Sequence, residues 1–420
     1  MAVKPGYKLT EVGVIPDDWE CVPSAYLVTY FGGNAFRSEA AVSDGIRWLK
    51  IANVGIQRAQ WEAPSFLPPA YGSKFKDYLL REGDVVMALT RPILNNQLKV
   101  AKLAQSDVPA LLNQRVAKVI AGSGADLGFI YYTLQMRRFA DSMSDAMAGS
   151  DPPNIGSKTL GRILVAVPKC VLEQRDIATA LSDVDALLSS LERLIAKKRD
   201  LKQAAMQQLL TGQTRLPGFT GDWQVRALGD LIRSCSSGAT PRRDQPDFYK
   251  GDVRWITSGE LNYNVITDTV EKITSEAVAR TNLKVIPKGT FLMAITGLEA
   301  AGTRGSCAIV GEPSTTNQSC MAIFPTSELL TEYLFHYYVF RGDALALQYC
   351  QGSKQQSYTA KLVRKLPISV PPTTEEQAAI AGVLSDMDTE LAALEQRLAK
   401  NHALKQGMMQ ELLTGRTRLL

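Results

Sequence analysis

The residue types that most often carry acid–base, nucleophilic or metal chemistry are few in this sequence. His336 and His402 are the only histidines among 420 residues, and neither has a nucleophile or further metal ligands at a recognisable spacing. We expect His336, within the aromatic segment YLFHYYVF, to be packed, and His402 to be solvated. The six cysteines are scattered with no C-x-x-C pair, which favours free thiols in a cytoplasmic protein over disulfides or a zinc site.

A second candidate for chemistry is the segment Asp151–Asn154, DPPN, which is similar to the D-P-P-Y motif of amino-methyltransferases. Asn154 replaces the aromatic residue that would stack on a flipped base, and no glycine-rich cofactor loop precedes it. The corresponding segment in the second half of the chain, KQQS from Lys354, has no trace of the motif. We therefore interpret both segments as polar loops and expect no catalysis by this chain; an enzyme site that includes Asp151 is the alternative.

Hydrogen-bonding side chains gather in loops after β-rich runs in both halves of the chain. Arginine reads guanine and asparagine or glutamine reads adenine through paired hydrogen bonds, so these loops are candidates for contacts with DNA bases; ordinary polar surface is the alternative. The candidate residues are Thr90, Arg91, Asn95, Asn96, Gln97 and Asn154 in the first half, and Thr240, Arg242, Arg243, Thr303, Arg304, Lys354, Gln355 and Gln356 in the second.

The elements that must position these loops are revealed by an internal repeat. A shift of 203 positions aligns Glu173–Leu216 with Glu376–Leu419 without a gap, and 25 of the 44 pairs are identical. The globular segments repeat more faintly: GDVVMALT (83–90) matches GTFLMAIT (289–296), and Asn113-Gln114 matches Asn317-Gln318. The chain is therefore predicted to hold two domains of one fold whose loops have diverged.

Each strongly repeated segment is predicted to form one long helix. Apolar residues at alternating spacings of four and three, such as Ile177, Leu181, Val184 and Leu188, make the narrow seam of a coiled coil. Gly212 and Gly415 provide stop signals. We favour pairing of the two helices with each other in an antiparallel coiled coil; the alternative is that each seam binds a partner protein. In that antiparallel arrangement the two ends of the chain should lie close together.

The predicted organisation is therefore α+β, with two tandem α/β globular domains separated and held by two long helices in a pseudo-twofold repeat. The boundaries are 1–172 and 213–372 for the domains, and 173–212 and 373–420 for the helices. The net charge is +5, and the positive excess lies in the globular parts, where a polyanion would bind. The chain has no run of 18 apolar residues and no secretory signal at its start, so we expect a cytoplasmic protein that does not associate with membranes.

Together these motifs resemble one known family over essentially the whole chain. The carriers of the resemblance are the run from Gly238-Ala239-Thr240-Pro241 to Leu261, the strand GTFLMAIT, the entry LPISVPPTTEEQAAI into the second helix, and the two LLTG-x-TRL helix ends. The chain resembles the specificity subunit of type I restriction-modification systems. The first half lacks the G-x-T-P stretch and has FGGNAFR (31–37) in its place.

The resemblance implies a division of labour. Each domain would read one half of a bipartite site in double-stranded DNA, and Thr257 and Ser258 join the candidate contacts. The coiled coil would set the spacing and dock two modification subunits, which bind S-adenosylmethionine and methylate adenine, while this chain binds no cofactor; a restriction/translocase subunit completes the complex. The alternative from another class is a stand-alone DNA-binding or scaffold protein without a methyltransferase partner.

Overall fold

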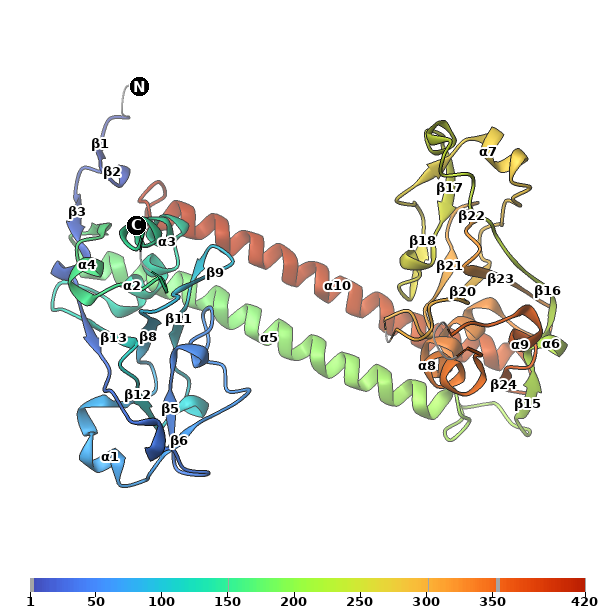
Figure 1. Cartoon of the computed structure of the whole chain (residues 1–420), viewed down its shortest axis with the longest axis horizontal. Helices are drawn as coiled ribbons and strands as arrows, with labels where there is room; N and C mark the ends of the chain where they lie inside the picture. The colour runs from blue at the N-terminus through green and yellow to red at the C-terminus, as the bar shows by residue number, and fades with distance from the viewer. Residues whose placement is uncertain (1–3, 150, 301, 353–355, 420) are drawn as a thin grey trace. The chain divides into compact units, whose positions relative to one another are not determined.

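The computed structural model describes residues 4–149, 151–300, 302–352 and 356–419 of a mixed α and β chain (Figure 1). The chain forms two compact units: unit 1 comprises residues 1–192 and 397–420, and unit 2 comprises residues 193–396. No helix in the described part of the chain is long and apolar enough to cross a membrane.

Two helices of 39 residues each, α5 (Val171–Leu209) and α10 (Thr374–Leu412), are the longest elements (Figure 1). Each helix contributes residues to both units. Gly212 and Gly415, which the sequence predicts as stop signals, follow the helix ends with φ of 71° and 69°, the left-handed conformation that glycine adopts freely. The predicted domain boundaries stay predictions; both predicted helices are present, and α10 ends at Leu412, before the predicted boundary at residue 420.

Within each unit the two helices run in opposite directions. In unit 1, Ile177 and Leu181 near the start of α5 share a core with Met409 and Leu412 near the end of α10. Unit 2 has the reverse arrangement, because Met206 and Leu209 at the end of α5 share a core with Ile380 and Leu384 of α10. The apolar seam read from the sequence is thus buried where the helices meet the globular parts, whereas Leu201 and Leu404 are 46% and 55% exposed. Most of the remaining helix surface is polar.

Unit 1 contains a four-stranded sheet in the order β11-β8-β13-β4 beside a second sheet in the order β6-β5-β12-β7. In the second sheet β12 runs parallel to β5, and the other pairs in both sheets are antiparallel. The strand bounds are Val28–Gly32 (β4), Ile46–Leu49 (β5), Phe66–Leu67 (β6), Leu79–Leu80 (β7), Val85–Ala88 (β8), Val100–Lys102 (β11), Ala110–Leu112 (β12) and Val116–Ala121 (β13).

Unit 2 repeats the order of four strands in the larger sheet and of three in the smaller, and adds β18 at the edge of the larger sheet. Its larger sheet reads β18-β21-β20-β23-β16, and its smaller sheet, β19-β17-β22, again has one parallel pair, β17 with β22. The strand bounds are Ile232–Ser237 (β16), Val253–Ile256 (β17), Asn264–Ile266 (β18), Lys272–Ile273 (β19), Phe291–Ala294 (β20), Cys307–Val310 (β21), Thr315–Thr316 (β22) and Cys320–Pro325 (β23). The faint repeat of the globular segments therefore corresponds to a shared strand order.

A further two-stranded sheet in each unit precedes the long helix. The run ILVAVP forms β14 (Leu164–Pro168), which pairs with β3 (Trp19–Pro23), and LPISVP forms β24 (Pro367–Val370), which pairs with β15 (Gln224–Ala227). Short hairpins complete unit 1: β1 (Tyr7–Thr10) with β2 (Gly13–Pro16), and β9 (Ile93–Leu94) with β10 (Gln97–Leu98).

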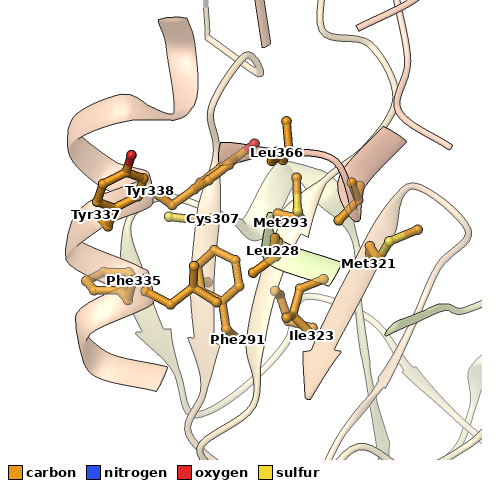
Figure 2. Packing of buried hydrophobic residues seen from close by; sticks show 14 of the residues in the cluster. Leu228, Phe291, Met293, Cys307, Met321, Ile323, Phe335, Tyr337, Tyr338 and Leu366 are labelled. Atoms are coloured by element: carbon orange, nitrogen blue, oxygen red, sulfur yellow. The ribbon is translucent and has the colours of Figure 1, made fainter. Parts of the chain in front are cut away.

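Helices cover one side of each larger sheet and close its core. In unit 1 these are α2 (Leu127–Leu134) and α3 (Arg137–Ala146), and in unit 2 the helix is α8 (Thr331–Tyr349). Figure 2 shows Phe291, Met293 and Ile323 of the unit 2 sheet facing aromatic residues of α8. Phe291 and Tyr338 are both fully buried with ring centroids 5.6 Å apart in an edge-to-face contact, which holds the sheet in place.

Candidate nucleic-acid interface

The predicted contact residues of unit 2 converge on one edge of its larger sheet. Strand β16 and strand β20 end at this edge and β21 and β23 begin there, as the pairings of Ser237 with Met321, Ala294 with Cys320 and Met293 with Cys307 show. The smaller sheet joins the same edge, because the amide of Asn317, after β22, donates to the carbonyl of Ile256 at the end of β17 (2.9 Å). Loops 238–243, 257–260, 295–306 and 317–319 therefore lie along one rim.

Thr240 and the two arginines that follow it occupy the first of these loops. The Thr240 hydroxyl bonds the exposed side chain of Gln318 (2.5 Å). Arg243 makes two hydrogen bonds to the Glu271 carboxylate, at 2.6 and 2.8 Å, and its guanidinium lies 4.3 Å from the centroid of the Tyr249 ring. The hydrogen bond with Glu271 raises the pKa of Arg243, and it lowers the pKa of the Glu271 carboxyl.

Arg242 is held differently. It binds Asp244 two residues on, at 2.6 and 3.0 Å, and both side chains are exposed. The hydrogen bond from Arg242 lowers the pKa of the Asp244 carboxyl. Exposed ion pairs contribute little stability, so Arg242 can exchange its partner for a phosphate more easily than the stacked Arg243.

Thr257 and Ser258 begin the next loop, and Thr257 has a local structural role. Its side chain and backbone amide both bond the Glu260 carboxylate, at 2.9 and 2.8 Å, in a capping box. The same carboxylate accepts a hydrogen bond from the amide of Val270 (2.9 Å). Thr257 therefore fixes the loop that carries Ser258, and both side chains are half-buried.

Thr303 and Arg304 lie in the loop between β20 and β21. Arg304 binds Asp343 of α8 at 2.6 Å, and its side chain is only 19% exposed. Gly305, at φ of 76°, lies so close to α8 that an added Cβ would be 2.6 Å from the Asp343 nitrogen, so the loop is pinned to that helix. The backbone of Gln356 bonds Glu299 and Leu298 of the same loop. Lys354 and Gln355 lie outside the described residues.

Unit 1 has an equivalent edge. Strands β4 and β8 end there and β11 and β13 begin there, and the amide of Asn113 donates to the carbonyl of Leu49 at the end of β5 (3.1 Å). Buried Thr90 bonds the Asn154 side chain (2.8 Å), and the backbone of exposed Arg91 bonds the carbonyl of Pro153 (2.8 Å). The DPPN segment thus lies against the loop after β8.

Asn95, Asn96 and Gln97 lie apart from Thr90 and Arg91, at the tip of the β9–β10 hairpin. Asn95 and Asn96 have φ of 50° and 59°, the conformation that a two-residue hairpin turn requires and that asparagine tolerates. The turn therefore gives a structural reason for asparagine at these two positions, in addition to the predicted contact with DNA bases. All three residues are exposed and line a cavity of about 280 Å³ that reaches Gln406 and Met409 of α10.

Two pairs of residues at the edges did not stand out as contact candidates in the sequence. Gly33 and Gly238 are at equivalent places, and a Cβ would be 2.2 Å from the carbonyl oxygen of Asn113 or 1.8 Å from that of Thr316. Gly33 is thus the counterpart of the glycine in the G-x-T-P stretch that unit 1 otherwise lacks. Gln114 and Gln318, both exposed, follow these contacts, and the match of Asn113-Gln114 with Asn317-Gln318 was the signal that could have identified them.

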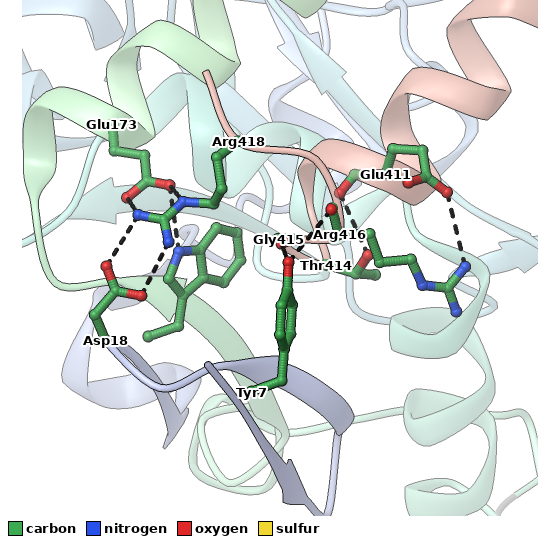
Figure 3. Close-up of polar contacts among 9 residues, drawn as sticks. Tyr7, Asp18, Glu173, Glu411, Thr414, Gly415, Arg416 and Arg418 are labelled. Atoms are coloured by element: carbon green, nitrogen blue, oxygen red, sulfur yellow. Dashed lines mark hydrogen bonds and ion pairs between the residues drawn. The ribbon is translucent and has the colours of Figure 1, made fainter. Parts of the chain in front are cut away.

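Each unit also has an arginine cluster where its long helices meet the globular part, and Figure 3 shows the cluster of unit 1. In unit 1 Arg418 makes two hydrogen bonds each to Glu173, at 2.5 and 2.9 Å, and Asp18, at 3.0 and 2.9 Å, and the indole of Trp19 donates to Glu173. Tyr7 also bonds the carbonyl of Gly415 (3.2 Å). Segments near the two ends of the chain therefore lie side by side, as the antiparallel arrangement predicts.

The equivalent cluster of unit 2 uses the same residue types. Arg215 makes two hydrogen bonds to Glu376, at 2.5 and 2.6 Å, and the indole of Trp223 donates to the same carboxylate (3.4 Å). The remaining donors of Arg215 bond the carbonyls of Thr220 and Gly221. Glu376 is 1% exposed, so this carboxylate depends on its partners.

A second repeated cluster links each globular part to the helix pair. In unit 1 the buried Lys405 binds Asp185 (2.6 Å), which accepts a hydrogen bond from Tyr132 (2.8 Å). In unit 2 Lys202 binds Asp388, and His336 lies at the position of Tyr132. His336 is 2% exposed and contacts Ser385 (3.0 Å), and burial lowers its pKa to about 4. The expectation of a packed His336 is confirmed, and His402 is exposed.

Comparison with known proteins gives consistent relatives. Residues 220–405 match the family described as type I restriction modification DNA specificity domain. The chain is 35% identical over 211 residues to the type I restriction enzyme MjaVIII specificity subunit of Methanocaldococcus jannaschii, covering 50% of this chain and 49% of the relative. It is 32% identical over 196 residues to the EcoAI specificity subunit of Escherichia coli, covering 46% of this chain and 32% of the relative.

These alignments span about half or less of the relatives' own length. The fold is similar over a longer stretch to that of a solved S subunit of a type I restriction-modification system from M. genitalium. That comparison has a TM-score of 0.63 at 15% identity and covers 98% of this chain and 99% of the other.

Proposed function

We infer that the chain belongs to the family of type I restriction-modification specificity subunits, and from this premise we propose that it is the sequence-reading subunit of a DNA methylation and restriction complex. Each unit would recognise one half of a bipartite site in double-stranded DNA. The observation that carries the proposal is the pair of equivalent sheet edges, which have the same strand order but different hydrogen-bonding side chains.

The two edges fit two different half-sites. Both edges offer an exposed glutamine, Gln114 in unit 1 and Gln318 in unit 2. Unit 2 adds Thr240 and the exposed Arg242, whereas unit 1 adds Arg91 and Asn154. Arginine and amide side chains discriminate bases through paired hydrogen bonds in the major groove. Equivalent scaffolds with unlike side chains would therefore read unlike sequences.

The long helices would provide the ruler. We propose that α5 and α10 form an antiparallel coiled coil that sets the spacing of the half-sites and docks two modification subunits, with a restriction/translocase subunit completing the complex. The opposite direction of the helices within each unit and their buried apolar seam support this role. Two half-sites must present compatible faces of the duplex, and a rigid spacer meets that requirement.

In this proposal the chain itself performs no chemistry. The modification subunits would bind S-adenosylmethionine and transfer its methyl group to adenine, and this chain would bind no cofactor. The DPPN segment supports a positioning role, since Asn154 bonds Thr90 and its loop bonds the backbone of Arg91. An Asp151→Ala variant should therefore still support methylation, with at most a changed preference in one half-site.

The test is to express the gene together with its modification subunit in a host without other type I systems and to map methylated adenines across the genome. We expect methylation at one split motif, which is absent when either gene is omitted. A stand-alone DNA-binding protein would bind its sites equally well without the modification subunit and would leave the methylation pattern unchanged. Failure to find any split motif with both proteins present would reject the proposal.

A further inference from the structure

Six non-glycine residues in the described part of the chain have a left-handed backbone, and four of them are explained by local structure. Asn95 and Asn96 form the two-residue turn of the β9–β10 hairpin. Asn282 follows helix α7 (Ser275–Arg280), where a left-handed residue ends the helix. Gln57, with φ of 64°, lies in a tight turn that is closed by the hydrogen bond from the Gly55 amide to the Arg58 carbonyl (3.0 Å) and by the antiparallel bridge of Val54 with Ala59. Arg91 and Tyr263, with φ of 47° and 57°, have no such explanation.

Gln57 and Tyr263 occupy equivalent places in the two units. The amide of Gln57 donates to the carbonyl of Val100 (2.7 Å), the first residue of β11, and the amide of Tyr263 donates to the carbonyl of Cys307 (2.9 Å), the first residue of β21. Strands β11 and β21 hold the same place in the shared strand order. The left-handed backbone thus recurs at one point of the fold, although the side chains differ.

Glycine would adopt this conformation freely, whereas a side chain there is strained. A tyrosine with positive φ is unusual, since asparagine and aspartate account for most non-glycine examples. Strain of this kind persists where the surrounding structure enforces it, and it concentrates at binding and catalytic sites. The fold therefore imposes a left-handed backbone at this place in both units. A polar side chain stands there in each unit where glycine would be less strained, which calls for a use of the side chains themselves.

Both residues lie at the proposed DNA-reading edge, because the strands that accept their amide hydrogen bonds, β11 and β21, begin there. Gln57 lines the cavity of about 280 Å³ together with Asn95, Asn96 and Gln97. Tyr263 is 47% exposed and lies at the start of β21, next to the loop that carries Thr303 and Arg304. Burial raises the pKa of Tyr263, which also interacts with Ser306 and Asp343 of this neighbourhood.

The Gln57 side chain is oriented as well as exposed. Its carbonyl oxygen accepts a hydrogen bond from the buried Lys405 (3.3 Å), and its backbone carbonyl accepts one from Tyr131 (3.2 Å). With the oxygen engaged, the amide nitrogen remains as the donor toward solvent. It lies at the margin of a second, open groove of about 790 Å³ beside α5, so a large ligand can reach it.

We propose that Gln57 and Tyr263 are a pair of specificity-determining residues that each contact a base of one DNA half-site. Gln57 donates from its amide to an acceptor on a base edge, and Tyr263 presents its hydroxyl and ring edge. This inference rests on the proposed function of the chain as a DNA-reading subunit. It adds one contact position that is equivalent in the two units. The candidate loops, by contrast, differ between the units in length and sequence.

The test replaces each residue by glycine in the full chain, co-expressed with its modification subunit, and reads the methylated motif genome-wide. Gln57→Gly should relax discrimination at one or two positions of one half-site by about tenfold or more and leave the other half-site intact. Tyr263→Gly should do the same to the opposite half-site. Because glycine relieves the strain, the thermal unfolding midpoint of both variants should be no lower than that of the original chain.

Asn282→Gly is the matched control, since it changes a left-handed residue that ends a helix, and both half-sites should be unchanged. A split motif that persists unaltered in both Gln57→Gly and Tyr263→Gly would overturn the inference while leaving the proposed function standing. Equal relaxation of both half-sites by either variant, or by Asn282→Gly, would also overturn it. Absence of any split motif with the original chain would instead reject the proposed function.

Discussion

The arginine clusters of the two units are built from the same residue types but are connected differently. In unit 2 Arg215 and Trp223 are neighbours along the chain, and both bond Glu376. In unit 1 Arg418 and Asp18 are 400 positions apart, and they meet at Glu173 with the indole of Trp19. In unit 2 a short stretch of chain already keeps the arginine and the tryptophan near each other. In unit 1 the ion pairs and the tryptophan themselves join segments that are distant in the sequence.

The clusters also differ in burial, which sets the size of the effects expected on mutation. Glu376 has 1% of its side chain exposed and Glu173 has 11%. Arg215 offers its remaining donors to backbone carbonyls, whereas Arg418 offers them to a second carboxylate, Asp18. The hydrogen bond from Arg418 lowers the pKa of Asp18. The stability of unit 2 should therefore depend more strongly on Arg215 than the stability of unit 1 depends on Arg418.

The largest effect is expected for Arg215→Met. This change leaves the buried Glu376 carboxylate without its charged partner, and breaking a buried pair in this way costs about 3–5 kcal/mol. The free energy of unfolding, measured by urea denaturation, should fall by that amount. Arg418→Met should cost less, because Glu173 is more exposed.

Arg416→Met is the matched control for both variants. Arg416 is 3.8 Å from Glu411 with side chains 65% and 47% exposed, and exposed pairs contribute about 1 kcal/mol or less. If Arg215→Met were no more destabilising than Arg416→Met, the cluster would not hold unit 2 together.

The second prediction uses the cluster in which Tyr132 of unit 1 corresponds to His336 of unit 2. Burial lowers the pKa of His336 from 6.5 to about 4, so the folded protein holds it neutral while the unfolded chain takes up a proton below pH 6.5. Stability from this group is therefore complete above about pH 6.5 and is lost as the pH falls toward 4. The loss approaches about 3 kcal/mol.

Urea denaturation at a series of pH values would measure this effect. Replacing His336 by phenylalanine should remove the part of the acid dependence that lies between pH 6.5 and 4. Tyr132→Phe in unit 1 is the control, because a phenol does not titrate in this range and its loss should shift the whole profile without changing its slope there. An unchanged slope in His336→Phe would refute the assignment.

Much of this architecture could be predicted because it rests on periodic patterns. The a/d seam of α5 and α10, the stop glycines Gly212 and Gly415, and the strand GDVVMALT with its counterpart GTFLMAIT all follow from local sequence rules. The contacts of Tyr7 with Gly415 and of Arg418 with Asp18 were foreseen only as nearness of the chain ends. The hydrogen-bonding partners of these residues depend on the tertiary fold. The spacing of residues along the sequence does not encode them.

The candidate interface was harder to predict, because its residues come from loops distant in sequence. Sequence alone placed Asn95 and Asn96 with Thr90, but the hairpin turn carries them toward α10. Nothing in the sequence singled out Gln57 or Tyr263. A left-handed backbone can be suspected from the residue type only where that residue is glycine or asparagine. The repeat offset could have aligned these two residues, but their unlike side chains concealed the match.

The smallest effect is expected on the exposed surface of α5 and α10, where the segments in unit 1 and the segments in unit 2 carry different charged residues. In unit 2 Lys198 binds Glu390 (2.7 Å) and Arg199 binds Glu395 (2.6 Å) across α5 and α10. At the repeat offset, unit 1 has Asn401 and Leu187 in place of Lys198 and Glu390. Introducing Asn401→Lys with Leu187→Glu should add a coupling of about 0.2–1 kcal/mol in a double-mutant cycle, because Leu187 is 37% exposed and loses little on replacement.

The transplanted pair should also respond to salt, since charges at an exposed helix surface are screened within about 10 Å at 0.1 M ionic strength. Its coupling energy should therefore fall when the cycle is repeated at 1 M sodium chloride, as should that of the native pair of Lys198 with Glu390. Zero coupling at low salt would mean that the side chains at positions 187 and 401 do not face each other. The two helix pairs would then differ in register as well as in charge, which contradicts the gap-free alignment of Glu173–Leu216 with Glu376–Leu419.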